Sequence, residues 1–199
     1  MKKNSFRIDL NSPVILGMAL LSLIFLIIDM MNSGRNINIF FSAYRTSIAD
    51  PMQYVRLFTH VLVHSDLGHY TGNFMMILAI GPMVEEKYGD RSLLLITACT
   101  ALITGLVNVL FFPGRAVLGA SGIVFMLILL ASFTNIQQGR LPITVPLVAV
   151  LYIGNEILRG LFNTDNISQL SHIVGGLCGA IFGVAFHFDK FKARPRRKS

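Results

Sequence analysis

The chain has 199 residues, of which 53% are apolar and only 14% are charged. With a mean hydropathy of +0.63, it is too apolar and too sparsely charged for an ordinary soluble domain. The formal net charge of +7 does not indicate a nucleic-acid partner, because the basic residues stand at the chain ends and in short loops. We therefore interpret the chain as an integral membrane protein.

Six apolar segments follow one another along the chain, and each is close to the length that a membrane-spanning helix needs. They cover residues 13–30, 69–84, 92–112, 118–134, 143–161 and 171–188. No internal repeat and no low-complexity stretch divides them. We predict an all-α membrane protein, with a cytoplasmic segment at 1–12, a six-helix domain at 13–188 and a basic cytoplasmic tail at 189–199.

The basic residues predict how these segments are oriented. With both termini in the cytoplasm of a bacterial-type cell, twelve Lys and Arg residues are inside and five are outside, as the positive-inside rule requires. The first segment has a longer apolar core than a signal peptide and no small-x-small cleavage site after it, so we expect it to stay in the membrane. Cys99 and Cys178 lie within apolar segments, where free thiols behave as small hydrophobic side chains, so no disulfide framework is predicted.

A serine opens the fourth segment, in the sequence Gly-Ala-Ser-Gly at 119–122. Asn135 comes fourteen residues after Ser121, which is about 21 Å of helix and less than a hydrocarbon core of about 30 Å, so Ser121 is predicted to lie below the outer face. His69 and His172 reach a similar depth on the second and sixth segments. Such a serine is often only a packing residue, but ionisable side chains within the membrane usually face a partner or a cavity.

These three side chains suit acyl transfer. Serine is a poor nucleophile unless a base such as a neutral imidazole lies beside it. His172 is followed by Gly175 and Gly179 on one helical face, and this glycine stripe predicts close contact with the start of the fourth segment. We therefore predict Ser121 as the nucleophile and His172 as the base, and we expect activity to fall steeply with side-chain size at Gly175.

His69 and Asn73 are four residues apart and project from one face of the second segment. The sequence indicates no negative charge near them, and both side chains can offer N–H donors to a tetrahedral oxyanion. The backbone N–H of Ser121 at a helix N-terminus adds another donor, and Gly119 and Gly122 keep that turn uncrowded. The alternative is an Asn-His pair that only bonds one helix to another.

Four motifs together resemble the rhomboid intramembrane serine proteases, and they occur in the order that this family shows. They are HYTGN, GPMVEEKYG, GASG and SHIVGGLCG. The resemblance implies a six-transmembrane-helix bundle with a partly embedded first outer loop and no metal or cofactor. It also implies an endopeptidase that cleaves single-span transmembrane substrates near the outer membrane face through a Ser-His dyad.

The resemblance also assigns roles by position. It implies that Ser121 and His172 form the catalytic dyad and that His69 and Asn73 contribute to the oxyanion hole. Other positions are matched to structural support or substrate binding: Arg56, Gly81, Glu85, Gly119, Gly122, Phe125, Gly175 and Gly179. Phe125 stands where many relatives have a tyrosine, so its ring can stack on the histidine without offering a hydroxyl. Val55 stands where many relatives have a tryptophan.

Two other functions stay open. His60, His64 and His69 include a His-x-x-x-His spacing typical of metal ligands, but a zinc protease would want a glutamate where this chain has Val61. An interfacial structural role is commoner for histidines in an amphipathic loop. The second alternative is a non-catalytic rhomboid-like protein that binds transmembrane segments. Transport fits less well, because no intramembrane Asp, Glu or Lys relay is present. Membrane lipid is a partner in every case, whereas the substrate and the oligomeric state do not follow from the sequence.

Overall fold

A computed structural model describes residues 11–32, 36–134, 143, 145–148, 150–151, 154 and 166–192. The elements in chain order are α1 (Pro13–Met31), α2 (Asn36–Phe41), α3 (Pro51–Thr59), the 3-10 helix η1 (His60–Leu62), α4 (Leu67–Tyr88), α5 (Asp90–Phe111), α6 (Ser121–Ser132) and α8 (Asn166–Lys192). The described part of the chain is thus all-helical, as predicted. Most of the predicted fifth span, 143–161, lies outside the described residues, so the count of six spans stays a prediction.

Three of the described helices are long and apolar enough to cross a membrane: α1, α5 and residues Gln169–His187 of α8. The apolar helix α6 has 12 residues and extends only about 18 Å, whereas α5 has 22 residues and extends about 33 Å. The sequence of residues 92–114 contains no Asp, Glu, Lys or Arg. The protein is therefore a helical membrane protein in which α6 is shorter than its neighbours.

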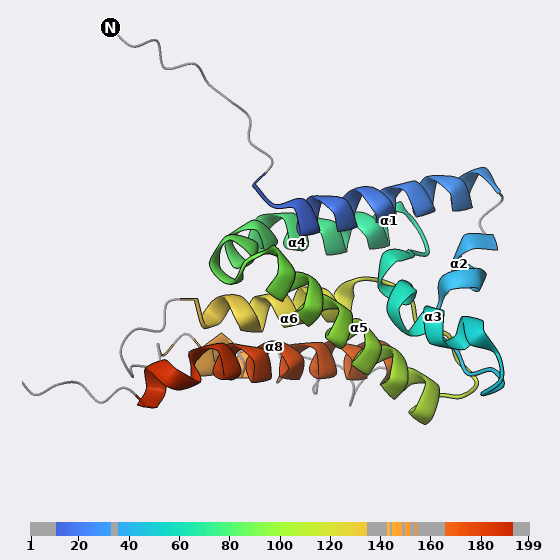
Figure 1. Cartoon of the computed structure of the whole chain (residues 1–199). Coiled ribbons are helices and arrows are strands. Elements are labelled where there is room, and N and C mark those ends of the chain that lie inside the picture. Colours follow the sequence, from blue (N-terminus) through green and yellow to red (C-terminus); the bar gives the residue numbers. More distant parts are fainter. Residues whose placement is uncertain are drawn as a thin grey trace, which may run out of the picture.

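Helix α6 is the central helix of the bundle. It lies between α4 and α8, and α5 crosses it (Figure 1). Eight of its 12 residues are buried, which is typical of a helix that is apolar around its whole circumference. Its most extensive contact is with α8. The first residue of α6, Ser121, is therefore positioned by several helices at once.

Polar caps and glycines set the helix ends that position the site. Helix α4 begins two residues before the predicted start, because the Asp66 carboxylate accepts the backbone N–H of His69 at 2.8 Å. Gly89, with φ of +82°, separates α4 from α5. Gly119 has φ of +108°, so the helix predicted from residue 118 begins only at Ser121.

The carboxylate of Glu85 joins the end of α4 to the start of α1. It is 1% exposed and accepts the backbone N–H groups of Val14 at 2.8 Å and Ile15 at 3.0 Å. The first turn of a helix has no intrahelical acceptors for such groups. A Cβ atom at Gly81 would lie 2.5 Å from Cδ1 of Ile15, so α1 packs on the bare backbone of α4. Gly81 and Glu85 thus fix how α1 meets α4.

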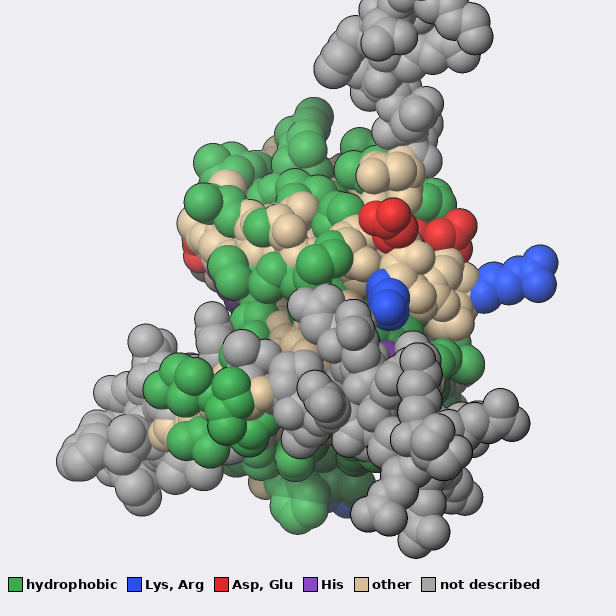
Figure 2. All heavy atoms as spheres, turned by 90° about the vertical axis from the view of Figure 1, so that its left-hand side faces the viewer, with side chains coloured by type: hydrophobic (Ala, Val, Ile, Leu, Met, Phe, Trp, Pro, Cys, Tyr) green, Lys and Arg blue, Asp and Glu red, His purple; other side chains and the backbone are tan. Residues whose placement is uncertain are grey.

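The two ends of the bundle differ in character. We call the end with Pro13, Glu85 and Asp90 the charged end, and the opposite end, with α2, α3 and residues 112–120, the loop end. Figure 2 views the charged end, where most of the visible acidic and basic side chains lie at the upper right, beside hydrophobic side chains. The exposed charged residues at this end are Glu86, Lys87, Asp90 and Arg91. A charged rim beside an apolar body is what a helix end at a membrane interface requires.

Candidate active site

The turn before Ser121 lies directly against two polar residues of α4. Gly119 adopts a backbone conformation that other residues rarely adopt. A Cβ atom there would lie 2.5 Å from Nε2 of His69 and 3.6 Å from Nδ2 of Asn73. Glycine is therefore needed at this position for its conformation and for its size. The structure brings His69 and Asn73 to the start of α6, where Ser121 stands.

The side-chain amide of Asn73 is a buried donor. The residue is 8% exposed, and its Nδ2 atom has no hydrogen-bond partner among the described residues. Leaving a buried polar group unpaired costs about 1–3 kcal/mol, so nearly all such groups are bonded. Ser121 is the first helical residue of α6, and the N–H groups of a first turn have no intrahelical acceptor. Side-chain and backbone donors thus meet at this turn.

A carboxylate lies closer to His69 than the sequence indicated. Asp66 accepts the backbone N–H of His69, and this bond is the main reason why the pKa of Asp66 is lowered. The carboxylate reaches the imidazole only through Ser65, whose Oγ is 2.7 Å from Oδ2 of Asp66 and 3.2 Å from Nδ1 of His69. Because the Ser65 hydroxyl donates its one proton to Asp66, its oxygen accepts from Nδ1–H of His69. Nε2, which faces Gly119, then carries a proton only when the imidazole is protonated on both nitrogens.

His172 comes to the same place from α8. Its ring stacks on the ring of Phe125, with centroids 4.4 Å apart and an interplanar angle of 7°. The preceding residue, Ser171, also borders α6, since its carbonyl oxygen lies 3.5 Å from the position of a Cβ atom at Gly122. Gly122, which follows Ser121, thus lies close to Ser171, which precedes His172. Ser121 and His172 are therefore neighbours of the residues where α6 and α8 come together.

The glycine stripe of α8 makes the close contact that its spacing predicted. A Cβ atom at Gly175 would lie 2.1 Å from the carbonyl oxygen of Gly122, and one at Gly179 would lie 2.2 Å from that of Met126. The stripe extends one turn beyond the prediction, to Gly183, where a Cβ atom would lie 2.5 Å from the ring of Phe133. At Gly175 and Gly179 the backbones of α8 and α6 meet with no side chain between them, whereas at Gly183 the bare glycine makes room for the Phe133 ring.

His60 and His64, expected at an interface, are instead buried and support the turn. Nε2 of His64 accepts the backbone N–H of Ala120 at 3.3 Å, and the carbonyl oxygen of His60 accepts that of Gly119 at 2.9 Å. The ring of His60 donates through Nε2 to the carbonyl of Ala101 at 3.0 Å. Their His-x-x-x-His spacing is visible in the sequence, where it indicates a metal-ligand pattern or an interfacial role but not a bond to the turn before Ser121.

Burial is the main reason why the pKa of each supporting histidine is lowered to about 4, and for His64 the neighbouring His69 is a second cause. Both rings are therefore neutral near pH 7, and neutrality is what lets Nε2 of His64 act as an acceptor. Within the described residues, no three His, Cys, Asp or Glu side chains are grouped to hold a metal ion. Of the three histidines that the metal alternative needs, His60 and His64 each direct one ring nitrogen to a backbone group, and Nδ1 of His69 bonds the Ser65 side chain.

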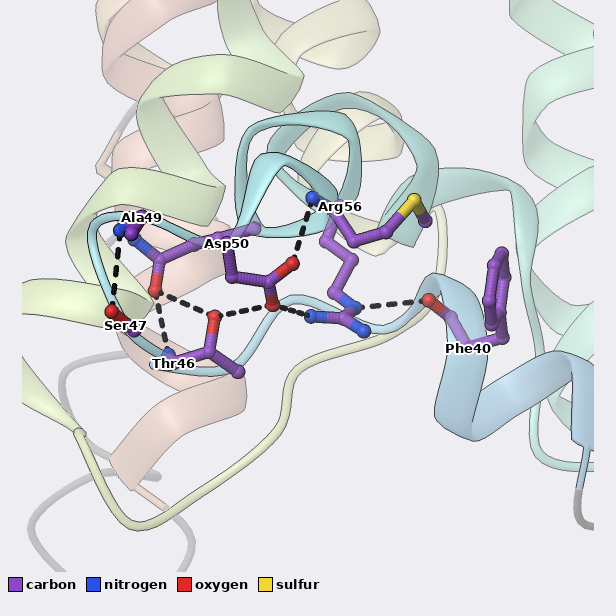
Figure 3. A network of polar contacts seen from close by, with 8 residues as sticks. Phe40, Thr46, Ser47, Ala49, Asp50 and Arg56 are labelled. Carbon is purple, nitrogen blue, oxygen red and sulfur yellow. Dashed lines mark hydrogen bonds and ion pairs between the residues drawn. The ribbon is translucent and has the colours of Figure 1, made fainter.

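Arg56 holds the loop between α2 and α3 (Figure 3). Its Nε donates to the carbonyl of Phe40 at 3.0 Å and its Nη1 to the carboxylate of Asp50 at 3.1 Å. The guanidinium lies over the ring of Tyr44, 4.4 Å from the centroid. A hydrogen bond from Thr46 is the main cause of the lowered pKa of Asp50, and Arg56 contributes to it. Arg56 therefore fixes the conformation of the loop.

Residues 51–188 match the family model of the rhomboid domain. The chain is 26% identical over 175 residues to the rhomboid protease GluP of Bacillus subtilis (strain 168), which covers 85% of this chain and 34% of that relative. It is 28% identical over 142 residues to the rhomboid protease GlpG of Salmonella newport (strain SL254), which covers 71% of this chain and 50% of that relative. The chain thus spans between about a third and a half of the length of these curated relatives. Because the family model matches more than half of the chain and includes every candidate site residue, the chain belongs to the rhomboid family.

Proposed function

We propose that this protein is an intramembrane serine endopeptidase that cleaves single-span transmembrane proteins near the outer face of a cell membrane, with both termini in the cytoplasm. The observation that carries the proposal is the buried amide of Asn73, which has no hydrogen-bond partner among the described residues. It lies beside Gly119, two residues before Ser121. An oxyanion that forms at Ser121 would pair with this donor.

In the proposed reaction, His172 accepts the hydroxyl proton of Ser121 while Oγ attacks the scissile carbonyl. The resulting oxyanion accepts hydrogen bonds from Nδ2 of Asn73, from the backbone N–H of Ser121 and from Nε2 of His69 in the form of the ring that carries a proton there. His172 then donates its proton to the leaving amine, and water hydrolyses the acyl-enzyme. The stack of His172 on Phe125 supports this scheme, because Phe125 lies one turn after Ser121 on α6.

The experiment that tests the nucleophile uses a fluorophosphonate probe and a single-span reporter protein, both with the full chain in liposomes. Ser121→Ala should abolish labelling and cleavage. Ser132→Ala is the matched control, since Ser132 lies on the same helix and its hydroxyl donates only to the carbonyl of Ile128. Equal labelling of wild type and Ser121→Ala would contradict the proposal. A reporter that copurifies intact with the wild type and is never cut would favour the non-catalytic binder.

A second experiment separates the oxyanion role of Asn73 from a structural one. Asn73→Leu keeps the branching of the side chain and removes the donor, so turnover should fall by about 10²-fold to 10³-fold, the loss seen for one oxyanion donor in a soluble serine protease. The melting temperature should stay the same or rise, because a buried polar group without a partner is replaced by an apolar one. A lower melting temperature with unchanged turnover would show that Asn73 only bonds helices together.

A further inference from the structure

A groove with a volume of about 570 Å³ lies between α1, α5 and the segment from α3 to η1, and none of the candidate catalytic residues borders it. Figure 1 shows the three elements that surround it. We call it the α1–α5 groove. Its walls are apolar, with Met18 from α1, Val61 from η1 and Ala98 from α5. Its volume falls within the range of about 300–1,000 Å³ that is usual for small-molecule sites.

Small residues create this hollow where the three elements converge. A Cβ atom at Gly17 would have no atom within 4 Å, so the space beside this glycine is open. On the opposite wall, Ala98 and Ala101 leave room that larger side chains would fill. At the rim, Leu21 is 41% exposed and Leu94 is 59% exposed. Both rim residues belong to helices that are able to cross a membrane, so the groove opens toward lipid chains.

One cation stands in line with the groove at the charged end. Arg91 precedes Leu94 by three residues and Ala98 by seven, so all three lie on one face of α5. Arg91 is exposed and forms no ion pair within the described part of the chain. The adjacent Asp90 projects about 100° away around the helix. From Arg91 to Ala101 the helix rises about 15 Å, which is room for an extended hydrocarbon chain below a charged group.

We propose that the α1–α5 groove binds one acyl chain of an anionic phospholipid whose phosphate pairs with Arg91. The bound chain would rest on Ala101, whose carbonyl accepts the ring N–H of His60. His60 in turn holds Gly119 through its own carbonyl. Lipid in the groove therefore steadies the wall that supports the turn before Ser121. The binding itself does not depend on the proposed protease function.

The binding test uses native mass spectrometry of the full chain in detergent, titrated with phosphatidylglycerol or with phosphatidylcholine of the same acyl chains. The wild type should retain one phosphatidylglycerol at lower concentration than phosphatidylcholine. Gly17→Leu should lose the retained lipid, because its side chain fills the groove. Gly72→Leu is the matched control, since Gly72 is an exposed glycine of α4 where a Cβ atom also meets nothing within 4 Å.

The charge is tested at Arg91. Arg91→Gln should lower the affinity for phosphatidylglycerol about fivefold, the factor that one basic residue contributes at an anionic membrane surface. Binding of phosphatidylcholine should fall by less, because its choline cation offsets the charge of its phosphate. Lys87→Gln is the control, because Lys87 is also basic and exposed at the charged end but borders a separate hollow with Met83 and Thr134. Equal effects of the two substitutions would overturn the role of Arg91.

The position of the chain is tested by photocrosslinking with phosphatidylglycerol that carries a diazirine in its acyl chain. Labelled peptides should contain residues 13–21 and 94–101, and labelling should disappear in Gly17→Leu and in Ala98→Leu. The second variant keeps the test valid if the first folds poorly. Undiminished labelling in both folded variants, or equal retention of both lipids by the wild type, would overturn the proposal. Because no readout involves proteolysis, an inactive protein would leave these outcomes unaffected.

Discussion

Two parts of the molecule hold the turn before Ser121 by different physical means. One is helix α8, which packs against α6, and the other is the loop of residues 43–66. Helix α8 meets α6 through Gly175 and Gly179, with no side chain in between. The loop meets the turn through directed hydrogen bonds, from Ala120 to the His64 ring and from Gly119 to the His60 carbonyl. The packing of α8 thus depends on glycines that have no side chain, whereas the packing of the loop depends on hydrogen-bond partners.

This difference decides which changes each side tolerates. A contact between two backbones leaves no space for an added carbon atom. It contains no titratable group, however, so it does not depend on pH. A polar contact can lose one bond for about 0.5–1.5 kcal/mol, yet it depends on the protonation state of the rings that take part. The predictions below test this comparison from the largest expected effect to the smallest.

The largest effect is expected from Gly175→Ala in α8. The sequence alone predicted a loss graded by size, with Gly175→Val much worse than Gly175→Ala. In the structure, most of the loss of activity is expected already with alanine, because its Cβ atom would lie 2.1 Å from the Gly122 carbonyl oxygen. A displacement of about 1 Å can cost about 10²-fold in rate. Reporter cleavage should fall by that factor and the melting temperature should drop, both measured in the same liposomes.

Gly72→Ala is the control for that substitution, since its Cβ atom meets nothing within 4 Å and alanine favours a helix over glycine. It should leave cleavage and melting unchanged or raise the melting temperature slightly. Wild-type behaviour of Gly175→Ala would mean that α6 and α8 are not in backbone contact.

The second effect concerns the pH dependence of the loop. His60 and His64 have pKa values of about 4 in the fold against an ordinary 6.5, so the unfolded chain binds more protons between these values. Stability is therefore full above pH 6.5 and is lost as pH falls toward 4, by up to about 3 kcal/mol for each ring. Asp50 and Asp66 have lowered pKa values, so their contribution to stability is lost only at lower pH than this window.

Melting temperatures measured between pH 7 and pH 4 test this dependence. The wild type should lose stability steeply across the window, and His60→Gln should show a shallower slope from a lower starting value. A wild-type melting temperature that is constant down to pH 4 would refute the burial of neutral histidines in the loop.

A smaller effect is expected from Arg56→Lys, within the loop of residues 43–66. Lysine cannot both bond the Phe40 carbonyl and lie flat over Tyr44, so the free energy of unfolding should fall by about 1–2 kcal/mol. Asp50→Asn should cost less than about 1 kcal/mol, because the Asp50 side chain is 31% exposed and exposed ion pairs contribute little. Denaturant titration gives both values. A larger cost for Asp50→Asn would mean that the ion pair, rather than the carbonyl bond, holds the loop.

The smallest effect is expected from Ser65→Ala. It removes the hydroxyl oxygen that accepts from Nδ1–H of His69, so more of the neutral ring carries its proton on Nε2. Turnover should rise about twofold to tenfold, the value of one hydrogen bond, with an unchanged melting temperature. Ser47→Ala is the control, since Ser47 bonds only within its own exposed turn. An equal rate for both variants would show that Ser65 does not set the state of His69.

The sequence by itself determined the features that depend on neighbours along the chain. Composition indicated a membrane protein, and five of the six apolar segments correspond to helices in the described residues. The i, i+4 spacing put Gly175 and Gly179 on one face, and the set of motifs identified the family. Glycine at position 119, just before a serine at a helix start, indicated the turn that precedes α6.

Only the tertiary structure decided which distant groups meet. The Glu85 carboxylate bonds N–H groups of α1 about 70 positions away, and His64 bonds Ala120 across 56 positions. Nothing in the local pattern separates a buried histidine that accepts a backbone N–H from one at an interface or on a metal. The α1–α5 groove likewise exists only because Gly17 and Ala98, small residues far apart in sequence, face one another. Periodicity fixes the face of a helix, whereas the partner of that face depends on how all the helices pack together.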